Sequence, residues 1–192
     1  GLSPAITGTP YFVGMAIGQL IFGVLADRFG RRPIMMVGLS VYALGALGAA
    51  TANGLGMLLV GRFIWGLGAA APAVLRMAIA RDLYAGERMA RVVSLVTAVF
   101  LIGPIVVPFI GEWILLSGSW RAVFAVAIAL AAVALAWAFA FGETLAPEHR
   151  QPLRIRPMTR AFAAVVTTRV TLWAIIAQAV FGAAFFIWLG SA

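Results

Sequence analysis

Cysteine and lysine are absent from this chain of 192 residues, and acidic residues and histidine are scarce. Without cysteine the chain forms neither disulfides nor thiolate metal sites. A single histidine, His149, leaves little for histidine-based catalysis, so we expect no enzymatic activity, no cofactor and no bound metal. Charged residues make up 10% of the chain, against about 25% in soluble domains. This low charge content argues against a soluble protein.

Long apolar runs take the place of charge. Hydrophobic residues account for 64% of the chain, and the mean hydropathy is +1.06. Because a helix needs about 20 apolar residues to cross the hydrocarbon core, we expect an all-α membrane protein. Six segments have the required length, at residues 10–26, 33–52, 55–80, 92–116, 122–141 and 170–190. These segments hold no Ser/His, paired Asp or His/Glu set of the kind that an intramembrane enzyme needs, so a polytopic membrane enzyme or scaffold is the least favoured alternative.

The basic residues, all of them arginines, alternate between loops. They gather at residues 27–32, 81–91 and 142–169, whereas the loops between carry at most Arg121. By the positive-inside rule these three loops face the cytoplasm, where they meet anionic lipid head groups. No basic stripe with interleaved aromatic residues lies on a soluble face, so the net charge of +8 does not indicate nucleic-acid binding. The chain then begins outside without an initiator methionine, and we expect a fragment that lacks one preceding helix.

A charged elbow separates the first two predicted spans. Its pattern is Gly23-x-x-x-Asp27-Arg28-x-Gly30-Arg31-Arg32. In an arbitrary loop these charges would be solvated topological anchors, and Gly30 would supply a left-handed turn. The pattern resembles the signature that joins transmembrane helices two and three in major facilitator transporters. The resemblance implies a twelve-helix carrier in which Asp27 and the nearby arginines form a cytoplasmic latch between two bundles.

One arginine of the third predicted span lies at membrane depth. Arg62 is about 10 Å from the outer end of the helix, where a guanidinium costs at least about 2.5 kcal/mol unless it snorkels or faces a cavity or partner. The surrounding Leu58-x-x-x-Arg62-x-x-Trp65-Gly66-x-Gly68-Ala69-Ala70 resembles the fourth-helix motif of the same family, with Trp65 in place of the usual glutamine. This implies a role for Arg62 in substrate or proton coupling. Arg76, about 40° around the helix from Arg62, is either a cytoplasmic anchor or a cavity residue.

Glycines and prolines are closely spaced in the fourth predicted span. They are Gly103, Pro104, Pro108 and Gly111. Such prolines bend a helix and such glycines allow close packing, as in any kinked membrane helix. The pattern also resembles the family's antiporter motif, in the Pro-x-x-x-Pro form of the bicyclomycin and chloramphenicol resistance branch, Bcr/CflA. Glu112, the only carboxylate inside a predicted span, is a candidate for coupling or a water-facing residue.

Further stretches agree with this branch, namely Arg81-Asp82-Leu-Tyr-Ala-Gly86-Glu87-Arg88, Trp120-Arg121 and Glu143-Thr144-Leu145. The charges Arg81-Asp82 and Glu87-Arg88 are interpreted as solvated loop residues.

Three parts are expected along the chain. Residues 1–141 form an amino-terminal bundle lacking its first helix, the proline-rich residues 142–169 form a cytoplasmic linker, and residues 170–192 form the first helix of a carboxy-terminal bundle. The resemblance implies a proton-coupled efflux antiporter, multi-pass in the cell inner membrane, that exports small drug-like or hydrophobic compounds by alternating access. Its expected partners are the small-molecule substrate, protons and the lipid bilayer, with no obligate protein partner. The alternative within transport is a porter for a metabolite or sugar.

Overall fold

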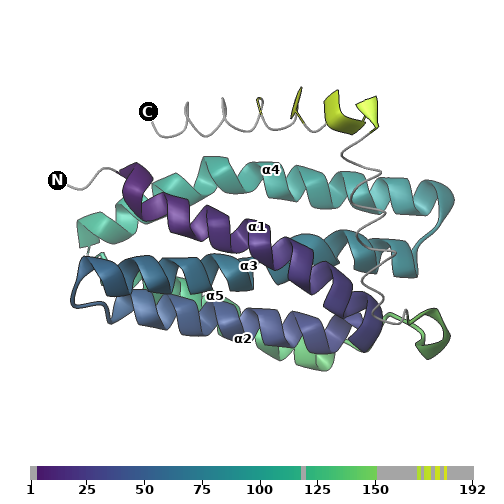
Figure 1. Ribbon diagram of the computed structural model, residues 1–192, viewed down its shortest axis with the longest axis horizontal. Helices are drawn as coiled ribbons and strands as arrows, with labels where there is room; N and C mark the ends of the chain where they lie inside the picture. The colour runs from purple at the N-terminus through teal and green to yellow at the C-terminus, as the bar shows by residue number, and fades with distance from the viewer. Residues whose placement is uncertain are drawn as a thin grey trace. The chain divides into compact units, whose positions relative to one another are not determined.

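The computed structural model describes residues 4–117, 120–150, 168–169, 171–173, 176–177 and 180. The chain divides into two compact units, Gly1–Gln151 and Pro152–Ala192. The described part of the first unit is helical (Figure 1). Its elements are α1 (Pro4–Phe29), α2 (Arg31–Ala50), α3 (Leu55–Leu83), α4 (Gly86–Ser117), α5 (Arg121–Ala140) and the short 3₁₀ helix η1 (Pro147–His149).

The first five predicted spans are confirmed as helices. Each of α1 to α5 is long and apolar enough to cross a membrane. The predicted start of the fourth helix at residue 92 was wrong, because α4 begins at Gly86. Hydropathy missed its first turns because they contain Glu87, Arg88 and Met89, which favour helix without being uniformly apolar. The predicted sixth span at 170–190, and residues 151–167 of the predicted linker, lie almost wholly outside the described residues.

Helix α3 packs between α1 and α2 through small side chains. On α1, every fourth residue from Gly14 to Ala26 is buried, which defines one helical face. Gly14 and Gly18 lie against the backbone of Phe63 and Leu67 in α3. Further along, Phe22 joins a buried cluster with Ile34 of α2 and with Ala70, Ala71 and Leu75 of α3. The three helices therefore share one core.

Two glycines on opposite sides of α3 set how closely its neighbours approach. A side chain at Gly66 would collide with the backbone of Tyr11 in α1, and one at Gly68 would collide with the backbone of Tyr42 in α2. Small residues of this kind allow helices to associate in lipid, where apolar surface alone gives no driving force. Backbone contacts thus fix the positions of α1 and α2 on α3.

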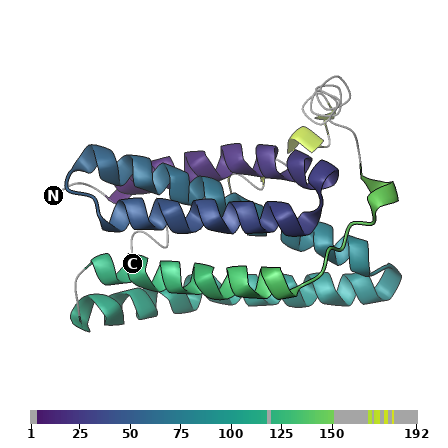
Figure 2. The same ribbon diagram turned by 90° about the horizontal axis from the view of Figure 1, so that it is seen from below.

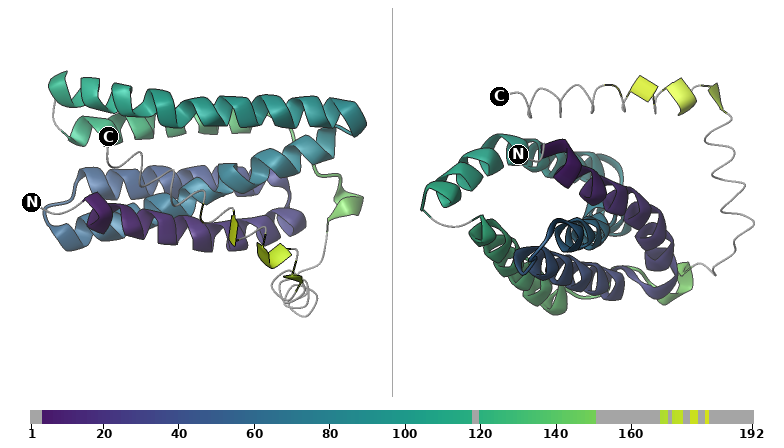
Figure 3. Two further views of the ribbon diagram at one scale, coloured as in Figure 1. Left: turned by 90° about the horizontal axis from the view of Figure 1, so that it is seen from above. Right: turned by 60° about the vertical axis from the view of Figure 1, so that its left-hand side comes forward.

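The last two long helices are placed differently around this three-helix core. Figure 1 shows α4 along one edge of the bundle and α5 next to α2 near the opposite edge. Seen from below and from above, both helices lie on the same side of α1 to α3 (Figures 2 and 3). Within the described residues, the most apolar stretch of α4 has no buried residue. In a bilayer, such an uncovered apolar helix faces lipid or protein beyond the described residues.

Candidate functional site

One guanidinium joins three helices at the charged elbow. Arg31, the first residue of α2, is 8% exposed and is the buried charged residue among those the structure describes. Its Nη1 lies 2.6 Å from Oδ1 of Asp27 near the end of α1, and its Nε lies 2.9 Å from Oδ2 of Asp82 near the end of α3. Arg31 therefore ties the α1–α2 elbow to the same end of α3.

The interpretation of Asp82 as a solvated loop residue was wrong. Helix α3 continues to Leu83, so Asp82 belongs to its last turn, and its side chain is only 16% exposed. The Asp27 side chain is 55% exposed by comparison. Of the two carboxylates that neutralise Arg31, Asp27 is thus the one open to a partner beyond the described residues.

A third carboxylate, that of Glu143, closes the start of α2. Its Oε1 accepts hydrogen bonds from the backbone N–H groups of Arg31 at 2.8 Å, Thr144 at 3.0 Å and Leu145 at 3.0 Å. Its Oε2 accepts a longer bond from the N–H of Arg32 at 3.3 Å. The first N–H groups of a helix have no partner within the helix and carry partial positive charge, so an anion there is stabilising. Glu143 thereby joins the segment after α5 to the elbow.

Gly30 makes this arrangement possible. The positive φ expected for Gly30 is confirmed. Its φ is 106°, a conformation that residues with a side chain rarely adopt. A side chain at this position would also collide with the Glu143 carboxylate. The family resemblance marked Glu143 only as one residue of a matching stretch. The sequence signal that could have singled out Glu143 was a lone acid directly after an apolar span. Its partners on α2 lie more than a hundred positions earlier in the chain, so the sequence did not indicate them.

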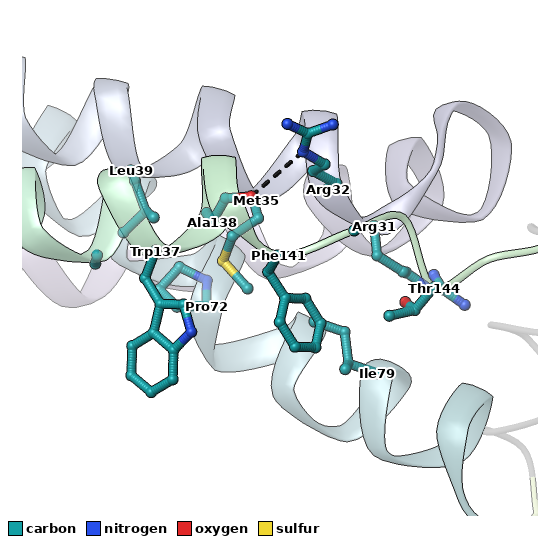
Figure 4. Close-up of a pocket in the computed structure, with 12 residues that line it drawn as sticks. Arg31, Arg32, Met35, Leu39, Pro72, Ile79, Trp137, Ala138, Phe141 and Thr144 are labelled. Carbon is teal, nitrogen blue, oxygen red and sulfur yellow. Dashed lines mark hydrogen bonds between the residues drawn. The ribbon is translucent and has the colours of Figure 1, made fainter.

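Two arginines bind α2 and α5 to each other at both ends. At one end, Arg32 of α2 donates from Nη2 to the Phe139 carbonyl of α5 at 2.6 Å and from Nε to the Ala138 carbonyl at 3.4 Å (Figure 4). At the other end, Arg121 of α5 donates from Nε to the Ala50 carbonyl of α2 at 3.1 Å. The last carbonyls of a helix lack partners and attract cations. Each arginine therefore caps the carboxyl end of the neighbouring antiparallel helix.

Arg62 lies among aromatic rings. Its guanidinium carbon is 5.7 Å from the centroid of Trp65 and 5.5 Å from that of Phe124 in α5. Trp65 in turn contacts the rings of Tyr11, Tyr42 and Phe124 at centroid distances of 5.4, 5.6 and 5.3 Å. The tryptophan that replaces the usual glutamine is thus the centre of a cluster with rings from α1, α2, α3 and α5. Cation–π contact stabilises a desolvated guanidinium.

Hydrogen bonding to Arg62 is incomplete. Its Nε is buried and has no hydrogen-bond partner within the described part of the chain. A buried donor of this kind is costly unless satisfied. Arg62 therefore points to a polar partner that the described residues do not supply.

Arg76 and Glu112 lie apart from this cluster. Arg76 places its guanidinium 4.3 Å from the ring centroid of Phe100 in α4, with its Nε buried and without a hydrogen-bond partner in the described residues. Arg62 and Arg76 therefore contact different helices. Glu112 is exposed on α4, and no ion pair joins it to Arg62 among the residues described.

The remaining predicted motifs stay predictions. On α4, Gly103 and Gly111 have open space around them. No described atom packs closely against either glycine. Pro104 and Pro108 fall within α4. At the elbow, Gly23 has room for a methyl group beside Val74, and Arg28 lies over the ring of Phe29 at 5.3 Å. Across the described ranges, no three His, Cys, Asp or Glu side chains gather closely enough to hold a metal ion.

Comparison with known proteins gives a consistent assignment. The chain is 38% identical over 157 residues to a bicyclomycin resistance protein homolog of Haemophilus influenzae, which covers 81% of this chain and 39% of that protein. It is 39% identical over 114 residues to the multidrug resistance protein MdtL of Klebsiella pneumoniae, covering 59% of this chain and 29% of that protein. The chain thus spans well under half the length of these relatives.

Solved structures agree on the fold. The crystal structure of the human organic anion transporter MFSD10 (TETRAN) superposes with a TM-score of 0.68 at 24% identity, covering 84% of this chain and 39% of that one. The sequence profile of the Major Facilitator Superfamily matches residues 1–192. Together with five helices suited to crossing a membrane, this match shows that the chain belongs to the Major Facilitator Superfamily of multi-pass membrane proteins.

Proposed function

We propose that the full-length carrier is a proton-coupled efflux antiporter for small hydrophobic compounds in the cell inner membrane. The observation that carries this proposal is the 38% identity to a bicyclomycin resistance protein homolog over most of this chain. The multidrug resistance protein MdtL, a second bacterial relative, supports the same substrate class and membrane.

The elbow network supplies the conformational latch in this proposal. Asp27, Arg31 and Asp82 hold α1, α2 and α3 together at one end, and Asp27 remains 55% exposed. An exposed carboxylate can face the positively charged amino end of a helix in the second bundle. If Asp27 contacts this helix end in one access state and separates from it in the other, the two bundles have two discrete arrangements with no stable intermediate.

Arg62 and its aromatic cluster supply the coupling site. A half-buried guanidinium that lacks a full set of partners attracts a carboxylate or a polar substrate group strongly, because the surrounding medium screens charge weakly. Trp65 adds a flat apolar surface on which a hydrophobic compound can lie. We infer that protons and substrate compete for a group close to Arg62.

Efflux measurements test the function. Cells expressing the full-length gene should lose a panel of hydrophobic antibiotics faster than cells carrying an empty vector, and an uncoupler that collapses the proton gradient should abolish the difference. Uptake of a metabolite or sugar, with no antibiotic efflux, would establish the alternative porter instead.

The topology gives a first specific prediction. Single cysteines placed at Phe29, the last residue of α1, and at Arg88, in the first turn of α4, should resist an impermeant thiol reagent added to intact cells, because both lie at arginine-rich helix ends expected to face the cytoplasm. A cysteine at the exposed Gly54, between α2 and α3, should react readily and serves as the control. The chain has no cysteine of its own to confuse the labelling. Labelling at Phe29 and Arg88 without permeabilisation would show the opposite orientation.

The latch gives a second prediction. Asp27→Asn should lower the transport rate about tenfold, equivalent to about 1.4 kcal/mol, while membrane abundance changes little. The amide keeps the size of the side chain, and Asp82 continues to balance Arg31. Glu148→Gln, which removes one exposed carboxylate from η1, is the matched control and should transport normally. Normal transport by Asp27→Asn at equal abundance would remove Asp27 from the latch.

A further inference from the structure

An apolar cavity opens between α2, α3 and α5, apart from the aromatic cluster around Arg62. Its volume is about 320 Å³. The walls include Met35 and Leu39 of α2, Pro72 and Ile79 of α3, and Trp137 and Phe141 at the end of α5 (Figure 4). Pro72 interrupts the hydrogen bonding of α3 beside the cavity, where a proline inside a helix is expected to bend it.

The cavity fits within the depth of a single membrane leaflet. Along α2 it extends from Arg32 to Leu39, a rise of about 10 Å at 1.5 Å per residue. Half of the hydrocarbon core is about 15 Å thick. Trp137 and Phe141 on its wall are 72% and 43% exposed, so no described residue covers this side of the cavity. A site of this shape accepts a hydrocarbon chain lying along the helices.

Two arginines lie at the mouth of the cavity beside the carboxylates of Asp27, Asp82 and Glu143, and the two arginines differ in their partners. Arg31, at the same end, is balanced by Asp27 and Asp82. Arg32 makes no ion pair with any described carboxylate. Its guanidinium donates to two carbonyls of α5 and lies over the Phe139 ring at 5.2 Å. A guanidinium has five N–H donors, so donors remain for a phosphate. Basic pockets between transmembrane helices on the cytoplasmic side are suited to anionic lipid head groups.

We propose that this cavity binds one acyl chain of an anionic phospholipid from the cytoplasmic leaflet, with the lipid phosphate at Arg32. The apolar walls supply affinity for any chain, and Arg32 supplies the preference for negative charge. The site is separate from the transport route through the Arg62 cluster, so its occupant is a resident lipid rather than an exported compound.

Native mass spectrometry of the purified full-length carrier tests this proposal. Phosphatidylglycerol should be retained about fivefold more strongly than phosphatidylcholine with the same chains, the effect expected of one arginine near the membrane surface. Arg32→Gln should remove this preference, whereas Arg28→Gln, which deletes a neighbouring arginine outside the cavity wall, should keep it. Ala134→Phe places a ring inside the cavity and should reduce retention of both lipids. Ala132→Phe, at an exposed position on the same helix, is the control.

A second measurement uses the fluorescence of Trp137 on the cavity wall. Brominated phosphatidylglycerol mixed at low fractions into phosphatidylcholine should quench the part of the fluorescence that Trp137→Phe removes, and this quenching should saturate before bulk lipid is replaced. Equal retention of the two lipids by the unaltered carrier, quenching that rises in proportion to the bromolipid fraction, or displacement of the lipid by a transported antibiotic would each overturn the proposal.

Discussion

Arg62→Ala should insert into the membrane at normal abundance but lose proton-driven efflux. Removal of a guanidinium from membrane depth relieves a cost of at least about 2.5 kcal/mol, so insertion does not suffer. Coupling should fall by at least about tenfold, within the range typical of linked binding sites. The group for which protons and substrate compete would no longer face a fixed positive charge.

Arg62→Lys separates charge from shape. The ammonium keeps the charge but lacks the planar fork that lies over Trp65 and Phe124, so its coupling should be intermediate. Arg91→Ala, at an exposed position near the start of α4, is the control for loss of one arginine. Drug-driven proton release and efflux are measured in vesicles at matched abundance. If Arg62→Ala releases as many protons per drug as the unaltered carrier, Arg62 is only a membrane anchor.

Glu143→Ala should lower the melting temperature of the purified carrier more than any other single acid-to-alanine change outside the Arg31 network. Four backbone N–H groups lose their acceptor, including the first two of α2. A lost helix cap costs up to about 2 kcal/mol, and hydrogen bonds to a charged group are worth about 1.5–3 kcal/mol each before solvent screening. The expected destabilisation is therefore about 2 kcal/mol.

Two further variants sharpen this test. Glu143→Gln keeps one carbonyl oxygen as an acceptor and should fall between the parent and Glu143→Ala. Glu148→Ala, five positions later in the exposed η1, should melt like the parent. Equal melting temperatures for Glu143→Ala and Glu148→Ala would show that the cap contributes nothing to stability.

Much of the helical framework could be predicted because lipid imposes a simple requirement. A segment that crosses the membrane must be predominantly apolar over about 20 residues and must satisfy its backbone internally. Helices α1 to α5 meet this requirement without reference to their neighbours. The unusual backbone at Gly30 was also predictable, since a glycine between charged residues at a tight elbow has few other uses.

The partners of the charged residues could not be predicted in this way. Arg31 binds Asp82 from fifty-one positions along the chain, and the Glu143 carboxylate reaches back across 112 positions. Periodicity reports which face of a helix is apolar, but contains no information on which charged ends meet in space. Trp65 was recognised as a departure from the family motif, yet the rings around it come from three other helices. Such contacts depend on how helices pack, which hydropathy does not encode.

Arg62 and Asp82 belong to one helix, about 30 Å apart at 1.5 Å per residue. Gly66 and Gly68 press the middle of that helix against the backbones of α1 and α2, so α3 has no clearance to rotate or slide alone. A movement of α3 near Arg62 is therefore expected to carry α1 and α2 with it. We therefore expect a displacement of α3 near Arg62 to be passed, through the bend at Pro72, to the Arg31 ion pairs at the far end of the same helix.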